Sequence, residues 1–235
     1  MFCEVPILKV AVLVDGEFFL KRYRRICPDS SKDLAQQVAK AMHKLMLDHV
    51  NRPNDRESNQ ERCALYRIFF YDCAPYTGKL HNPISKKCID YSKTDQAIWR
   101  LEFHEQLKKL RKVALRLGTL GTGRDWSIHK KRIDQMFKGS IAFGDLTDKD
   151  VFPVLKQKGV DIKIGLDIAS LAFKKQVERI VLVSGDTDFV PAAKLARREG
   201  IDFVLDPMWN PINPLLWEHI DGLHSTCPNP KKAVS

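Results

Sequence analysis

The sequence has few cysteines, no long apolar run and no leader-like start. Its six cysteines form no C-x-x-C pair and no zinc-like spacing, so we expect buried, reduced thiols. The N-terminus lacks the basic region of a signal peptide and reaches Asp15 and Glu17 early. No apolar run approaches the roughly 18 residues of a membrane span. These absences argue against secretion and membrane association and predict a cytoplasmic protein.

Acidic residues are outnumbered by basic ones. The chain has 235 residues, and its 39 Lys and Arg against 29 Asp and Glu give a net charge of +10. Such a balance favours polyanionic partners, with nucleic acid first and anionic membrane second. The chain can bury a core without disulfides, and it contains no internal repeat or low-complexity tract. We therefore predict one domain over residues 1–235, with a core at about 8–224 and a short flexible C-terminal tail.

Short β-branched runs alternate with helical patterns along the chain. The predicted strands are Lys9–Val14, Ala64–Tyr71, Val113–Leu120, Arg179–Ser184 and Ile201–Leu205. The predicted helices are Ser31–His49, Ser92–Lys112, Phe189–Glu199 and Leu215–Leu223. A further helix is predicted to follow Gly159–Ile164, with Leu166, Ile168, Leu171 and Ala172 facing inward. Closely spaced strand, helix and strand form a right-handed crossover, which predicts an α/β fold with a largely parallel sheet.

Aspartates follow several of the predicted strands. They are Asp15, Asp72, Asp186 and Asp206. Loops after the carboxyl ends of parallel strands form the ligand crevice of such sheets, so these side chains could converge. Asp161 and Asp167 flank the start of the helix that precedes the strand leading to Asp186. Hard divalent cations such as Mg²⁺ or Mn²⁺ take oxygen ligands, and two ions about 4 Å apart can activate water against a phosphodiester.

A purely structural interpretation competes with the metal site. An aspartate after a strand is also a common helix cap or turn former, which alone explains Asp72 and Asp206. Asp188 could likewise cap the helix that contains Pro191. Asp186 is harder to explain in this way, because capping needs one carboxylate and the turn supplies two.

Two other motif interpretations fit poorly. An EF-hand loop starting at Asp186 would need Gly and Glu where the chain has Pro191 and Arg197. The D-T-D-F-V stretch is also similar to the nucleophile motif of haloacid-dehalogenase phosphatases. That motif comes early in its family, whereas here little chain follows it.

Four motifs in order resemble one known family. V-L-V-D-G-E-F-F, F-F-Y-D-C-A-P-Y, K-G-V-D-I-K-I-G-L-D-I-A-S-L-A and V-L-V-S-G-D-T-D-F-V-P together resemble the NYN domain, in its LabA-like branch of the PIN-like nuclease superfamily. The resemblance runs from about Val10 to Leu223. It implies a PIN-like α/β/α sandwich with a central, largely parallel sheet, and metal-dependent cleavage of single-stranded or structured RNA.

The resemblance also implies roles for particular residues. The catalytic set by position is Asp15, Asp161, Asp167, Asp186 and Asp188. Asp15, Asp167, Asp186 and Asp188 are the implied ligands of Mg²⁺ or Mn²⁺, whereas Asp161 could instead face the sheet edge or orient a neighbour. Glu17 departs from the family pattern, where many relatives have Asn, and could replace an amide contact or add a ligand.

Basic residues gather in two places that could hold RNA. The candidates are Arg22, Arg24, Arg25, Arg124, Lys130, Lys131 and Arg132, with Trp126 as a ring that could stack on a base. The competing interpretation is that these cations only solvate a helix face and that Trp126 is a partly buried structural ring.

The leading hypothesis is a metal-dependent endoribonuclease that uses activated water and forms no covalent intermediate. The alternative is a non-catalytic RNA-binding or regulatory protein that retains the fold. A phosphatase of small molecules is a third and weaker hypothesis. The sequence leaves the oligomeric state and the RNA target open.

Overall fold

The computed structural model describes residues 7–28, 33–51, 62–121 and 125–230. The strands are β1 Ile7–Asp15, β2 Arg62–Cys73, β3 Lys79–His81, β4 Cys88–Asp90, β5 Val113–Gly121, β6 Trp126–Ile128, β7 Val151–Pro153, β8 Lys156–Lys158, β9 Arg179–Val183, β10 Asp202–Asp206 and β11 Gly222–Leu223. The helices are α1 Gly16–Ile26, α2 Ala35–Asn51, α3 Asp95–Lys108, α4 Lys130–Phe137, α5 Val160–Phe173, α6 Val190–Arg198 and α7 Pro214–Trp217. Short 3-10 turns include η4 Asp148–Asp150 and η5 Thr187–Phe189. Among the described residues no helix is long and apolar enough to cross a membrane.

Two compact units divide the chain. The first comprises the described parts of Met1–Asp72, Glu102–Gly118 and Gly159–Ser235, and the second comprises those of Cys73–Leu101 and Thr119–Lys158. The second unit contains two small antiparallel pairs, β3 with β4 and β6 with β7. In the same unit β8 pairs antiparallel with the end of β5. The single-domain count stays a prediction.

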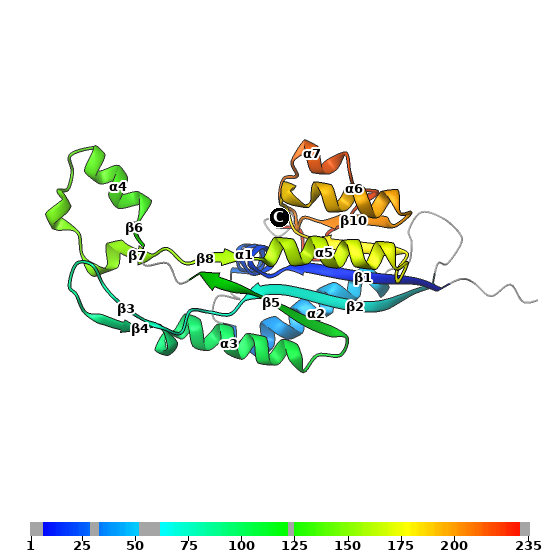
Figure 1. Ribbon diagram of the computed structural model, residues 1–235, viewed down its shortest axis with the longest axis horizontal. Helices are drawn as coiled ribbons and strands as arrows, with labels where there is room; N and C mark the ends of the chain where they lie inside the picture. The colour runs from blue at the N-terminus through cyan, green and yellow to red at the C-terminus, as the bar shows by residue number, and fades with distance from the viewer. Residues whose placement is uncertain (1–6, 29–32, 52–61, 122–124, 231–235) are drawn as a thin grey trace, which may run out of the picture. The chain divides into compact units, whose positions relative to one another are not determined.

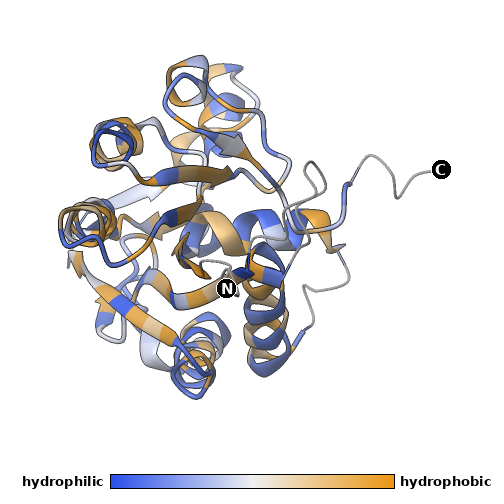
Figure 2. Ribbon diagram, turned by 90° about the vertical axis from the view of Figure 1, so that its right-hand side faces the viewer, coloured by the Kyte–Doolittle hydropathy of each residue, from blue (hydrophilic) through white to orange (hydrophobic). Residues whose placement is uncertain are grey.

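The first unit is built on a mostly parallel sheet. Its strand order is β11-β10-β9-β1-β2-β5, and β1 pairs in parallel with both β2 and β9 (Figure 1). β1 lies between two neighbours, and residues 10–14 within it are fully buried. Hydrophobic residues colour much of the strands in Figure 2, and the helices carry both colours, as amphipathic helices do. The predicted α/β fold with a largely parallel sheet is confirmed.

Helices cover both faces of this sheet. Phe70 on β2 contacts the rings of Phe19 on α1 and Phe103 on α3. The next residue, Tyr71, hydrogen-bonds Asp167 on α5. Successive side chains of a strand point to opposite faces, so α1 and α3 cover one face and α5 covers the other.

Two local predictions need correction, and one helix was not predicted. The unpredicted helix is α1, which follows β1 at once; Gly16 is required at their junction because a Cβ there would lie 2.5 Å from the Tyr71 carbonyl oxygen. The helix predicted at Leu215–Leu223 is wrong: α7 ends at Trp217, and Gly222–Leu223 pairs with β10 instead. Leu166 is not inward but 63% exposed, because it lies on the opposite side of α5 from buried Ile164.

Candidate active site

The site begins at the carboxyl end of β1, where Asp15 closes the strand. Its Oδ1 accepts a hydrogen bond from the Phe18 backbone N–H at 3.1 Å, so Asp15 caps α1. The Ser184 hydroxyl, on the chain leaving β9, donates to Asp15 Oδ2 at 3.4 Å. Burial, and after it the nearby charges of Asp161 and Glu17, raise the pKa of Asp15 to about 6 although the hydrogen bonds from Phe18 and Ser184 lower it. The surroundings of Asp15 therefore disfavour the ionised form of its carboxyl group.

Asp161 joins the same electrostatic group. It lies in the first turn of α5 and is exposed. Although the residue is exposed, desolvation of its carboxyl by neighbouring atoms raises its pKa, and the charges of Asp186, Asp188 and Glu17 add to that effect. The structure thus brings Asp161 close to Asp186 and Asp188, which follow β9. It also brings Asp161 close to Asp15, at the end of β1.

Asp186 and Asp188 lie on the short turn between β9 and α6. Asp186 Oδ1 accepts from the Asp188 backbone N–H at 3.0 Å and caps the turn η5. The N-cap of α6 is Phe189, so the interpretation of Asp188 as the cap of that helix is wrong. Both carboxylates are exposed. Asp186 therefore caps the turn η5, and the Asp188 carboxylate beside it is exposed to solvent.

Asp167 has a different environment. Its Oδ2 accepts a hydrogen bond from the Tyr71 hydroxyl at 2.7 Å and lies 3.3 Å from Arg116 Nε. It follows Asp161 by six residues of α5, which is about 9 Å along the axis and about 120° around it. Asp161 and Asp167 therefore occupy different faces of the helix. The role of Asp167 as a metal ligand stays a prediction.

Each of the two remaining strand-end aspartates is buried and forms a hydrogen bond with a histidine. Asp72 Oδ2 lies 2.7 Å from His104 Nε2, and Asp206 Oδ2 lies 2.9 Å from His49 Nε2. All four side chains are at most 3% exposed. A buried carboxylate is stabilised only with such a partner, which supports the structural interpretation of Asp72 and Asp206. No local sequence pattern predicts that these histidines pair with the aspartates.

Carboxylates of this kind fit a hard divalent cation. The donors are oxygens from separate elements, and their mutual repulsion, seen at Asp15 and Asp161, is what a bound cation relieves. In the described part of the chain no three His, Cys, Asp or Glu side chains form a ready-made metal cluster. Mg²⁺ commonly keeps several waters and binds through one or two carboxylates, so a loose set remains compatible with it.

The predicted RNA contacts of the first unit separate into two kinds. Arg22 is buried, and its Nε and Nη2 donate to the Met208 carbonyl oxygen at 3.1 and 2.5 Å. Its guanidinium thus positions the chain after β10. Arg24 and Arg25, in the last turn of α1, are exposed. Of that predicted cluster, these two side chains are exposed and Arg22 is not.

The predicted contacts of the second unit gather around β6 and α4. Lys130 and Lys131 are exposed, and Arg132 donates to Asp150 at 2.7 Å, which lowers the pKa of that carboxyl to about 2. Trp126 is half-buried and lines an apolar cavity of about 380 Å³. The other lining residues include Ile84, Ile128, Phe143, Leu146 and Val151. Arg124 lies outside the described residues.

Comparisons with known proteins find a family model and two similar proteins. The model of the NYN domain matches residues 102–208, which contain Asp161, Asp167, Asp186 and Asp188 and leave out Asp15. An uncharacterized protein of Methanocaldococcus jannaschii is 28% identical over 101 residues, which cover 43% of this chain and 39% of that protein. A crystal structure of a protein of unknown function from Vibrio parahaemolyticus superposes with a TM-score of 0.46 at 16% identity, over 95% of this chain and 94% of the other.

Proposed function

Because residues 102–208 match the model of the NYN domain, a domain of the PIN-like nuclease superfamily, we propose that the protein is a metal-dependent endoribonuclease. The observation that carries the proposal is the electrostatic grouping of Asp15, Asp161, Asp186 and Asp188 around the ends of β1 and β9. The LabA-like assignment stays a prediction. The relative in Methanocaldococcus jannaschii is itself uncharacterized, so the activity rests on this chain's own residues.

The proposed site would hold Mg²⁺ or Mn²⁺ through Asp15, Asp167, Asp186 and Asp188. When bound, such an ion supplies an activated water and stabilises the leaving oxygen of a phosphodiester. Ser184 orients the Asp15 carboxylate, and the Tyr71 hydroxyl orients that of Asp167. Asp161, on the exposed first turn of α5, is proposed to tune the charge of this group.

RNA is the proposed substrate, single-stranded or structured. An acidic site repels a phosphate backbone, so cations elsewhere must supply attraction. Arg24, Arg25, Lys130 and Lys131 are exposed and are proposed to contact phosphates. Trp126 is proposed to offer a ring to a base.

The proposal is tested by incubating labelled single-stranded RNA with Mn²⁺ and the wild-type protein, Asp186→Asn or Glu105→Gln. Glu105 is an exposed carboxylate on α3 paired with Lys108, so it controls for loss of one negative charge. We expect cleavage by the wild type and Glu105→Gln, none with EDTA, and at least a hundredfold loss in Asp186→Asn. Equal cleavage by Asp186→Asn would contradict the proposal.

A chemically modified substrate separates this mechanism from that of a contaminating nuclease. Attack by water does not need the 2′-hydroxyl of the RNA, whereas metal-independent ribonucleases that use this hydroxyl as nucleophile do need it. We therefore expect the protein to cleave 2′-O-methyl RNA in Mn²⁺ at a detectable rate.

A non-catalytic RNA-binding protein is the second candidate. The exposed Lys130 and Lys131, which follow the half-buried Trp126 by four and five residues, favour it. RNA binding that is unchanged by EDTA and gives no product would support this candidate over the first.

A further inference from the structure

Helix α5 exposes a continuous apolar stripe. Ile162, Leu166 and Phe173 are 69%, 63% and 60% exposed, and Ala169 lies between the last two. Their spacings of four, three and four residues place all four side chains on one side of the helix. From Ile162 to Phe173 the stripe runs for three turns, or about 16 Å.

This stripe is not part of the core of the first unit. The opposite side of α5 already supplies that core through Ile164, Ile168 and Leu171, which are at most 3% exposed. The helix is therefore apolar on two sides, and only one of them is covered. A single exposed apolar residue needs no explanation, but a row of large ones at helical spacing indicates an interaction surface.

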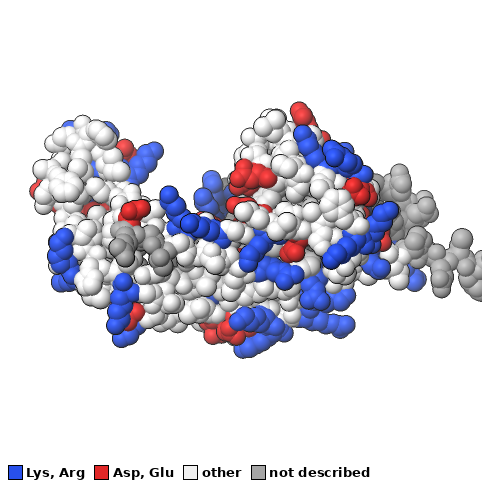
Figure 3. Space-filling model, viewed as in Figure 1, with Lys and Arg blue, Asp and Glu red and all other residues white. Residues whose placement is uncertain are grey.

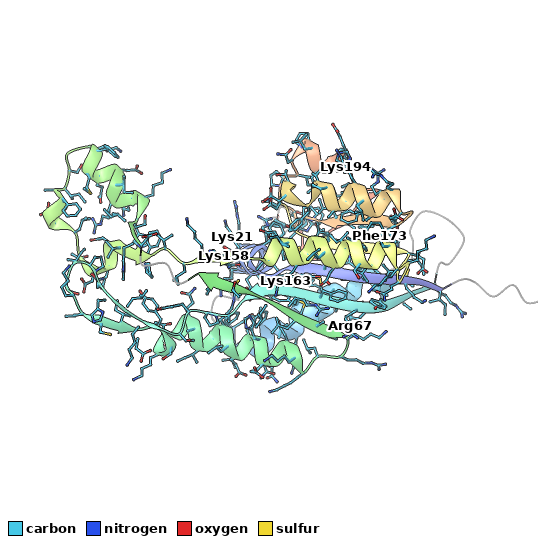
Figure 4. The ribbon with its side chains drawn as sticks, in the orientation of Figure 1. Lys21, Arg67, Lys158, Lys163, Phe173 and Lys194 are labelled. Carbon is cyan, nitrogen blue, oxygen red and sulfur yellow. The ribbon has the colours of Figure 1, made fainter. Side chains whose placement is uncertain are left out.

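Cations flank the stripe on both sides. Lys163 and Lys174 lie on the side of α5 that faces β5, where Lys163 Nζ donates to the Leu117 carbonyl oxygen. Lys194 on α6 lies on the other side, and Arg67 on β2 is exposed as well. Figure 4 shows Lys163 and Phe173 on α5 with Lys194 and Arg67 to either side, and Figure 3 shows Lys and Arg gathered on this face.

The acidic groups near the stripe do not cancel these charges. Asp167 is the carboxylate on the β5 side of α5, and it is already paired with Arg116. Asp161 precedes the stripe and belongs to the candidate active site. The edges of the stripe are therefore predominantly positive.

We propose that this stripe, with its flanking cations, is a docking surface for an acidic amphipathic helix of a partner protein. Leucine-like side chains of such a helix would cover Ile162, Leu166 and Phe173, and its flanking carboxylates would meet Lys174 and Lys194. A second copy of this chain fits less well, because two copies of the surface would bring lysines against lysines. The proposal does not depend on the ribonuclease activity.

The test uses a fluorescent 18-residue helical peptide with Leu along one face and Glu on both flanks. We expect saturable binding to the full-length protein, measured by fluorescence anisotropy, and at least tenfold weaker binding of the same peptide with Lys in place of Glu. The double variant Leu166→Ser with Phe173→Ser should also weaken binding of the Glu peptide at least tenfold. Leu215→Ser is the matched control, because Leu215 is 60% exposed on α7.

Several results would overturn the proposal. They are failure of the Glu peptide to bind, equal binding of the two peptides, and undiminished binding by a double variant whose thermal unfolding matches that of the wild type. Light scattering that shows a wild-type dimer lost in the double variant would assign the stripe to a second copy. Cosedimentation with phosphatidylserine vesicles that the double variant loses would assign it to a membrane. RNA cleavage should be the same in all of these variants, which keeps this test separate from that of the proposed function.

Discussion

The Tyr71 hydroxyl on β2 donates a 2.7 Å hydrogen bond to Asp167 Oδ2 on α5. Burial, and then this bond, raise the pKa of Tyr71, so the phenol keeps its proton. The bond joins the sheet to the helix that carries two of the predicted catalytic aspartates. It therefore offers a way to test how α5 is held in place.

Removal of this hydroxyl should destabilise the protein. A hydrogen bond to a charged acceptor contributes about 2 kcal/mol, so we expect Tyr71→Phe to lower the free energy of unfolding by about that amount in urea titrations. Tyr66→Phe is the control, because the Tyr66 hydroxyl donates only a 3.4 Å bond to the neutral Gln176. Its cost should stay below about 1 kcal/mol. Equal losses in the free energy of unfolding for the two variants would show that the bond to Asp167 contributes no more than the bond to Gln176.

The raised pKa of Asp15 predicts a pH dependence of stability without metal. The unfolded carboxyl loses its proton near pH 3.8, whereas the folded one keeps it up to about pH 6. Between these values the folded state binds more protons, so the free energy of unfolding falls as the pH rises. The contribution of Asp15 to this fall is on the order of 3 kcal/mol.

Asp15→Asn should remove this contribution while it preserves the cap of α1, because an asparagine oxygen can also accept the Phe18 N–H bond. Urea titrations at pH 4, 5, 6 and 7 in EDTA would measure it. If the difference between the two proteins stayed constant over this range, the pKa of Asp15 would not be raised.

Added Mn²⁺ should stabilise the folded protein. An ion that binds only the folded state at a hundred times its Kd raises the free energy of unfolding by about 2.7 kcal/mol. We expect Mn²⁺ to raise the Tm of the wild type and of Glu105→Gln, and to raise that of Asp186→Asn by less than half as much. Differential scanning fluorimetry would measure the three shifts. Identical shifts would exclude Asp186 from the metal site.

The strand-end aspartates should divide into structural and functional ones. Asp206 forms a buried pair with His49, and loss of one member of such a pair costs about 3 to 5 kcal/mol. Asp186 is exposed, so its removal should cost about 1 kcal/mol at most. We therefore expect Asp206→Ala to be far less stable than Asp186→Ala in urea titrations. A similar cost for both would contradict the division.

The central strands could be predicted because their sequences are simple. β1 and β9 are short β-branched runs, and such runs identify strands buried on both faces. The helix α1 could not be found in this way, because Asp15-Gly16 is equally typical of a turn. Gly16 closely approaches the Tyr71 carbonyl oxygen, and this tertiary contact favours a helix over a turn after Asp15.

The candidate site could be predicted only in part for a similar reason. Asp15 and Asp186 follow strands, and the order of strands in the sheet brings strand ends together. The partners of Asp72 and Asp206 lie 32 and 157 residues away in sequence, so no local pattern distinguishes these buried carboxylates from exposed ones. The orientation of α5 about its axis, which separates Asp161 from Asp167 and exposes Leu166, likewise depends on packing.

The lysines at the start of α4 predict a salt dependence of RNA binding. Lys130 and Lys131 are exposed, and each phosphate contact by a lysine contributes about 0.7 to the slope of log K against log salt for single strands. We expect the double variant Lys130→Gln with Lys131→Gln to lower the slope by about 1.4 and to weaken RNA binding at low salt. The control is Lys138→Gln, an exposed lysine at the other end of the same helix. Anisotropy titrations in Ca²⁺ between 50 and 200 mM salt would measure the slopes without turnover, and an unchanged slope in the double variant would mean that these two lysines only solvate the helix.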